Sequence, residues 1–175
     1  MDNRDVLDGL TKAGLVDLIG IYSKNWLALD GLWFQSVERK FGMDEAMFHD
    51  EEAWRSFAAI EARRLKAFLK LPERAGLEGL KRALELRFYS NLNAYEFLFE
   101  DGKLVFRNVE CRVQAARARK NMPLHPCKSV GIIDYTEFSR AIDDRIRCRC
   151  LSCYPEVTDE TVNCSWEFTL QISSE

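Results

Sequence analysis

Cysteine is the residue type in this chain that offers the most chemistry, and its placement is uneven. The first 110 residues contain none, and all six cysteines follow. They are Cys111, Cys127, Cys148, Cys150, Cys153 and Cys164. Thiolates bind zinc, hold iron–sulfur clusters, attack carbonyl carbons and exchange with disulfides. Their confinement to one part of the chain indicates a site there rather than a bias in composition.

Cys150 and Cys153 have the spacing of a two-ligand metal clip, because thiolates three residues apart can converge on one ion. Cys148 lies two residues earlier and, in a strand, shares a face with Cys150. We therefore expect a zinc site, with an iron–sulfur cluster or a redox dithiol as alternatives. Cys164 lies among core-facing residues, where a free cysteine is often simply a small buried apolar side chain. The candidate ligands are Cys111, Cys127, Cys150, Cys153 and Cys164.

Cys127 is the candidate for reactivity. It follows Pro126 just before a predicted helix, and a helix N-terminus favours a thiolate. His125, one of two histidines, lies two residues earlier and is a reserve ligand or base. The chain has no phosphate-binding glycine loop and no Gly-x-Ser-x-Gly elbow, so Cys127 is the only nucleophile that we single out.

Basic residues are concentrated between Lys103 and Lys128, where Glu110 is the only acid. Such a patch favours a carboxylate or phosphate ligand, and we expect Arg117 and Lys128 to edge its binding site. The alternative is an ordinary solvated surface.

Composition excludes several classes of protein. A net charge of −3 argues against nucleic-acid binding, and no apolar run is long enough to span a membrane. No secretion signal is recognisable, so we expect a cytoplasmic protein with reduced thiols. A chain of 175 residues, 47% hydrophobic, is most simply one domain over residues 1–175.

The first ninety residues have the apolar periodicity of about three helices. They are predicted from Leu15 to Phe41 with a stop at Gly42, from near Asp50 to Pro72, and from Gly76 to Tyr89. The tryptophans Trp26, Trp33 and Trp54 are expected in the helix-packing core.

Residues 91–175 are predicted as a hairpin, a helix and a cysteine-rich sheet. Asp101-Gly102 is a hairpin turn that places Phe97 opposite Phe106 and Glu96 opposite Arg107. The second arm is expected to continue through Cys111 and Val113. A helix from Tyr135 to Ile146, a strand from Ile146 to Leu151 and a last strand from Val162 to Ile172 follow. The fold class is therefore α+β.

Two segments of the chain carry a resemblance. They are the run from Trp33 to Arg87 and the pattern Cys111-Arg112-Val113-Gln114, Pro126-Cys127-Lys128, Cys150-Leu151-Ser152-Cys153-Tyr154-Pro155 and Cys164-Ser165-Trp166-Glu167-Phe168. The pattern resembles an uncharacterised family of small cytosolic proteins, largely from anaerobic bacteria and archaea. More remotely it is similar to the L-2-amino-thiazoline-4-carboxylate hydrolase-like group and to V4R-type ligand-binding domains. The resemblance implies a ligand pocket between helices and sheet, although the Cys148, Cys150 and Cys153 run departs from that group.

Three functional hypotheses follow. The first is a metal-binding domain whose pocket takes a small anionic molecule. The second, implied by the remote resemblance, is a hydrolase of a small cyclic or amide substrate that uses Cys127 or a metal-bound water. The third is a scaffold or oligomer-forming protein such as a homodimer. Whether the protein is an enzyme is open at this stage.

Overall fold

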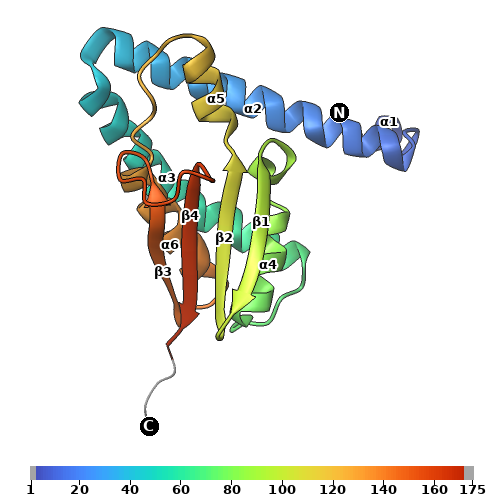
Figure 1. Ribbon diagram of the computed structural model, residues 1–175. Coiled ribbons are helices and arrows are strands. Elements are labelled where there is room, and N and C mark those ends of the chain that lie inside the picture. Colours follow the sequence, from blue (N-terminus) through green and yellow to red (C-terminus); the bar gives the residue numbers. More distant parts are fainter. Residues whose placement is uncertain (1–2, 172–175) are drawn as a thin grey trace.

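The computed structural model describes residues 3–171 and has the predicted α+β architecture (Figure 1). Its helices are α1 (Arg4–Asp8), α2 (Lys12–Phe41), α3 (Met43–Phe68), α4 (Gly76–Glu85), the 3-10 helix η1 (Phe88–Asn91), α5 (Arg112–Arg119) and α6 (Lys128–Ile142). Its strands are β1 (Ala94–Glu100), β2 (Lys103–Glu110), β3 (Ile146–Cys153) and β4 (Cys164–Leu170). Within these residues, no helix combines the length and apolar character needed to cross a membrane.

Gly42 separates the two long helices. Its φ of 95° suits glycine, and its N–H donates to Glu38 at the end of α2. The same residue precedes α3, whose first turn carries Asp44 and Glu45. The predicted end of α2 is therefore confirmed, whereas the predicted start of the next helix near Asp50 is wrong. The chain needs only one residue to turn, and acidic side chains favour a helix start at either position.

The four strands form one antiparallel sheet in the order β1-β2-β4-β3. The predicted hairpin register is confirmed, with Phe97 opposite Phe106 and Glu96 opposite Arg107. Asp101 and Gly102 both have positive φ, as a two-residue turn of this kind requires.

The path after the hairpin differs from the prediction. β2 ends at Glu110, and Cys111 begins the unpredicted helix α5 instead of continuing the strand toward Val113. The helix predicted from Tyr135 begins earlier, at Lys128, and ends at Ile142. β3 continues past Leu151 to Cys153, and β4 begins at Cys164. Ile172, predicted in the last strand, lies outside the described residues.

Helices cover one face of the sheet. α6 packs on β3 and on α3, and α4 packs on β2 and β4, while α2 crosses beyond one end of the sheet (Figure 1). Leu104, Trp166 and Phe168 from the sheet meet Phe138 and Ile142 from α6 in a fully buried core. Burial of such apolar surface is the main stabilising contribution to the fold.

The tryptophans divide between core and surface. Trp26 and Trp54 pack with Phe88 and Tyr89, with ring centroids 4.0 Å apart for Trp26 and Phe88 and 5.7 Å apart for Trp54 and Tyr89. Trp33, predicted in the core, is 59% exposed. That prediction is wrong because Trp33 lies on an outer part of α2, where His49, 6.0 Å away between ring centroids, covers it only in part.

A buried ion cluster ties the helices together. Arg87 is 3% exposed and donates to both carboxylate oxygens of Asp134, at 2.8 and 3.0 Å, and to Glu61 at 2.9 Å. Its guanidinium lies 4.4 Å from the centre of the Phe138 ring. Burial raises the pKa of both carboxyl groups, and the neighbouring Arg87 charge opposes that effect.

Candidate functional site

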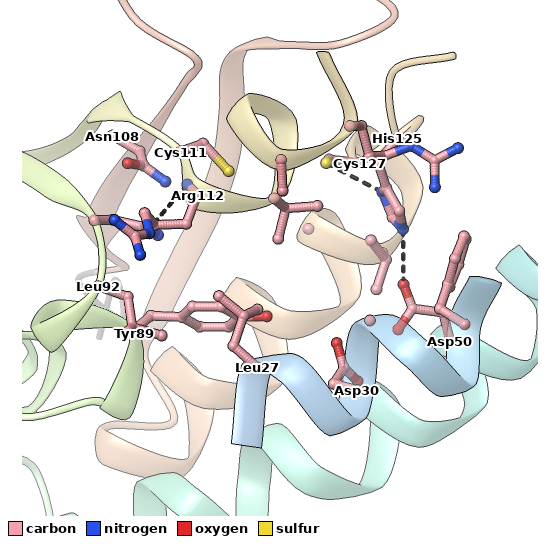
Figure 2. Close-up of a pocket in the computed structure, with 18 of the residues that line it drawn as sticks. Leu27, Asp30, Asp50, Tyr89, Leu92, Asn108, Cys111, Arg112, His125 and Cys127 are labelled. Atoms are coloured by element: carbon pink, nitrogen blue, oxygen red, sulfur yellow. Dashed lines mark hydrogen bonds and ion pairs between the residues drawn. The ribbon is translucent and has the colours of Figure 1, made fainter. Parts of the chain in front are cut away.

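A cavity of about 480 Å³ lies between α2, α3, η1, α5, the start of α6, the end of β3 and the start of β4 (Figure 2). That volume is in the range of small-molecule sites. Four of the six cysteines line it: Cys111, Cys127, Cys153 and Cys164. These four thiols come from separate segments of the chain and face one interior.

Cys127, His125 and Asp50 form a chain of polar contacts on the cavity wall, as the dashed lines in Figure 2 show. The Nδ1 atom of His125 lies 3.2 Å from the Cys127 sulfur. Its Nε2 atom lies 3.3 Å from Asp50 Oδ2. In the tautomer with the proton on Nε2, the N–H faces the Asp50 carboxylate and the Nδ1 lone pair faces the thiol. This is the order nucleophile, base and orienting acid that thiol enzymes use.

Gln114 fixes this arrangement from α5. Its side-chain nitrogen donates to the His125 carbonyl at 2.8 Å, and its oxygen accepts from the His125 N–H at 3.0 Å. The same nitrogen lies 3.3 Å from the Cys127 sulfur. The loop before α6 is thus held by two hydrogen bonds to a buried amide, and the histidine ring also lies against Phe34, 4.6 Å between centroids.

Cys127 is the residue preceding α6, as predicted. The expectation that this position favours a thiolate is not met, because burial raises the pKa of the Cys127 thiol well above its usual value, and the nearby Cys111 and Cys164 add to the effect. Desolvation of the charged form outweighs the helix dipole. The Cys127 thiol is therefore neutral, and to act as a nucleophile it would need a base.

A second carboxyl group faces the cavity from α2. Burial, with a smaller contribution from the Asp50 charge, raises the pKa of Asp30 to about 6. Figure 2 shows Asp30 and Asp50 reaching the cavity from neighbouring helices, with the Tyr89 ring across from them. Burial also raises the pKa of Tyr89, so its hydroxyl stays protonated. The cavity thus offers a hydroxyl donor beside two carboxyl groups.

The predicted metal ligands do not assemble. Cys150 does not line the cavity, and Cys148 is a neighbour of Phe168 in the core. Within residues 3–171, no group of three or more histidine, cysteine or acidic side chains is placed to hold a metal ion. The expected zinc or iron–sulfur site therefore receives no support from the arrangement of the thiols.

Cys153 and Cys164 lie directly opposite each other on β3 and β4. The Cys153 N–H donates to Glu156 rather than across to Cys164, which makes them a non-hydrogen-bonded pair with close side chains. The neighbouring Cys153 thiol lowers the pKa of the Cys164 thiol, against the opposing effect of burial. Trp166 lines the cavity beside them, and its indole N–H makes no hydrogen bond of normal geometry although the Cys164 thiol is adjacent.

The two basic residues predicted to bind a ligand are already occupied. Arg117 lines the cavity, but it is 3% exposed and pairs with both carboxylate oxygens of Glu38, at 2.6 and 2.9 Å. Lys128 pairs with Glu156 and does not line the cavity. These ion pairs hold α5 to α2 and α6 to the loop after β3.

Cationic side chains other than Arg117 and Lys128 line the cavity. They are Lys24, Arg112, Arg119 and Lys120, all exposed. Within residues 3–171, the guanidinium of Arg112 makes no hydrogen bond or ion pair, while its backbone N–H donates to Asn93. Arg112 therefore has free donors beside the cavity, as an anion-binding residue requires.

Comparison with known proteins gives a family and no activity. Residues 8–170 match a family described as "Family of unknown function (DUF6125)". No curated protein matches the chain. The family match therefore assigns no activity to the chain.

Proposed function

The chain belongs to the DUF6125 family, and we propose that this member is a thiol-dependent hydrolase of a small anionic amide or cyclic substrate. One observation carries the proposal: Cys127, His125 and Asp50 form a connected chain on the wall of a cavity of about 480 Å³. Covalent catalysis requires a nucleophile within hydrogen-bond reach of a base, and a third group that orients the base.

The reaction begins with proton transfer. His125 takes the Cys127 proton on Nδ1 while the sulfur attacks the carbonyl or amidine carbon of the substrate, and Asp50 stabilises the imidazolium that forms. The carbon–nitrogen bond then breaks, and His125 returns the proton to the leaving nitrogen. Water attacks the thioester or its nitrogen analogue, again with His125 as base, and releases the product and the free thiol.

The surroundings favour a substrate with one anionic end. Lys24 and Arg112 are exposed cations at the cavity, so a carboxylate held there would reach inward past Tyr89. Burial keeps the Cys127 thiol neutral, so it does not repel that charge. The remote resemblance to the L-2-amino-thiazoline-4-carboxylate hydrolase-like and V4R-type groups makes thiazoline carboxylates the first compounds to test. Free thiols of this kind fit a reducing compartment such as the cytoplasm.

Turnover of thiazoline carboxylates and of small N-acyl amino acids tests the proposal, together with mass analysis of acid-quenched protein for an adduct on Cys127. We expect Cys127→Ala to abolish turnover and adduct, and His125→Asn to lower kcat by about 10²- to 10⁴-fold. The matched control is Cys148→Ala, a half-buried thiol outside the cavity, with activity within about twofold of the wild type. Circular dichroism confirms folding of each variant.

Two results would contradict the mechanism. Turnover that survives Cys127→Ala excludes a Cys127 nucleophile. Stoichiometric zinc that chelation removes together with activity would assign the attack to a metal-bound water, as the metal hypothesis expects.

The opposed thiols support a second candidate function, a redox-active dithiol formed by Cys153 and Cys164. In a non-hydrogen-bonded pair the Cα atoms lie about 4.5 Å apart, within the range that a disulfide spans. Cys164, the more acidic thiol, would reduce a peroxide to water and become a sulfenic acid. Cys153 would then displace a second water and close the disulfide.

Peptide mapping after treatment with hydrogen peroxide tests this candidate. We expect a Cys153–Cys164 disulfide that dithiothreitol reverses, that Cys153→Ser prevents and that Cys148→Ser leaves intact. Oxidation of Cys164 to the sulfinic acid in the wild type, without a disulfide, would refute it.

A further inference from the structure

Helix α2 has apolar side chains that the rest of the molecule does not cover. Of its thirty residues, all described, only Ser23 is buried. The first half of α2, together with α1, extends beyond the sheet and the other helices (Figure 1). A long helix with this many apolar residues is stable in water only when something buries them.

Five exposed residues of α2 and the half-buried Leu18 follow a heptad repeat. Leu15, Leu18, Tyr22, Asn25, Leu29 and Leu32 alternate in steps of three and four, and we call them the α2 stripe. Tyr22, Leu29 and Leu32 are 60%, 68% and 63% exposed. Apolar residues at alternating steps of three and four mark the seam of a coiled coil.

We propose that two copies of this chain form a homodimer in which the α2 stripes pack antiparallel across a two-fold axis. Facing positions have residue numbers that sum to 47, so the two-fold axis passes between Ser23 and Lys24. Leu15 faces the partner's Leu32, and Leu18 faces the partner's Leu29. Tyr22 faces the partner's Asn25, so the one polar layer joins a phenol to an amide that can hydrogen-bond it.

The stripe fits itself in both directions, which favours a second copy over an unrelated protein. A two-fold interface must be self-complementary, and this pairing leaves no apolar residue facing a charge. Isolated polar residues at such seams fix register, a role that Asn25 and Tyr22 would fill at the centre.

The exposed area is sufficient. Large apolar side chains at and beside the stripe are 37% to 68% exposed. They are Leu15, Ile19, Ile21, Tyr22, Leu29, Leu32 and Trp33. At about 100 Å² each, from the 150–250 Å² that a large aromatic side chain buries, they supply about 700 Å² per protomer. A standard stable interface needs about 800 Å² per partner, so contacts of α1 and the polar rim are enough to complete it.

The dimer leaves the catalytic cavity open. Lys24, Leu27 and Gly31 line the cavity from a face of α2 that differs from the stripe. Leu32 alone belongs to both, so the partner's Leu15 would sit at the rim of the cavity.

Sedimentation velocity over about 1 to 100 μM tests the dimer, with an expected mass of twice 20.3 kDa. Leu29→Glu is expected to give a monomer with an unchanged circular dichroism spectrum. The matched control is Val16→Glu, a residue 59% exposed on another face of the same arm, which stays dimeric. A monomeric wild type over this range, or a dimer unaffected by Leu29→Glu, would overturn the proposal. A monomer that instead binds anionic lipid vesicles through α2 would overturn it as well.

Cysteine cross-linking tests the register. A mixture of Leu15→Cys and Leu32→Cys protomers is expected to form a covalent heterodimer under mild oxidation. Each variant alone is not, because like positions lie about 26 Å apart, at 1.5 Å per residue over seventeen residues. Cross-linking of Leu15→Cys to itself would mean parallel helices and would refute the antiparallel pairing.

Discussion

Replacement of Asp30 by asparagine should stabilise the protein at neutral pH and leave its stability at low pH unchanged. Asp30 lies on α2 beside the cavity, and its pKa is raised from 3.8 to about 6, first by burial and then by the Asp50 charge. An acid whose pKa is higher in the folded state holds its proton more tightly there than in the unfolded chain. Stability is therefore lost as the pH rises from about 4 to about 6, and the loss persists above that range.

The magnitude follows from the shift. About two pKa units at 1.36 kcal/mol each give about 3 kcal/mol as the cost of ionised Asp30 above pH 6. Asparagine keeps the shape and carries no charge, and its amide can meet water in the cavity. We expect Asp30→Asn to raise the free energy of unfolding by about 2 to 3 kcal/mol at pH 8, with the difference disappearing below about pH 4.

Urea unfolding at half-unit intervals from pH 4 to pH 8, followed by circular dichroism, measures this difference. Asp17→Asn, at an exposed carboxylate on the same helix, is the control and should change little at any pH. A stability difference that is the same at pH 4 and pH 8 would refute the reasoning, because it would trace to packing or helix propensity and not to the ionisation of Asp30.

Three further changes test other parts of the structure. Arg87→Met should lower the free energy of unfolding in urea by about 3 to 5 kcal/mol, because it leaves the buried carboxylates of Glu61 and Asp134 without their partner. A decrease under about 1 kcal/mol would contradict this pairing. Gly131→Ala places a methyl group 2.6 Å from the buried Trp166 ring, so thermal melting should show about 1 to 3 kcal/mol of destabilisation. An unchanged Tm would mean that this contact is absent. Asp143→Asn should cost about 2 kcal/mol at pH 7, because the Arg145 hydrogen bonds lower the pKa of Asp143 to about 2; the difference should shrink as the pH falls from 4 to 2, and a loss that persists at pH 2 would point elsewhere.

The parts of the fold that could be predicted from the sequence are those determined locally. The Asp101-Gly102 turn sets its own register, and Gly42 alone ends α2. Helix α5 was missed because Arg112–Arg119 carries little apolar periodicity, and its two buried residues are polar. Gln114 and Arg117 hold α5 through hydrogen bonds to residues that the sequence does not bring together.

In the candidate site, too, the locally determined residues could be predicted from the sequence and the distant one could not. Cys127 and His125 are close in sequence, and the predicted helix start after Pro126 singled out Cys127 with His125 two residues before it. Asp50 lies within a run of acids in the first third of α3, where nothing in the sequence distinguishes it from Glu51 or Glu52. Its role appears only when α3 packs beside the loop before α6. Long-range placement of this kind depends on tertiary packing, which periodicity does not specify.

The charges around the cavity bear on how its chemistry is controlled. Burial raises the pKa of the Cys127 thiol and of the Tyr89 hydroxyl, so both stay neutral at pH 7, while Lys24 and Arg112 carry positive charge at the exposed side. On the proposed mechanism, these cations attract an anionic substrate to the opening, and the Cys127 thiol that it meets inside is uncharged. Because that thiol is protonated, its sulfur would become reactive only when His125 accepts the proton in the presence of substrate. Such a site should react slowly with simple alkylating agents in spite of its accessible cavity, and the same burial that suppresses the free thiolate limits its oxidation.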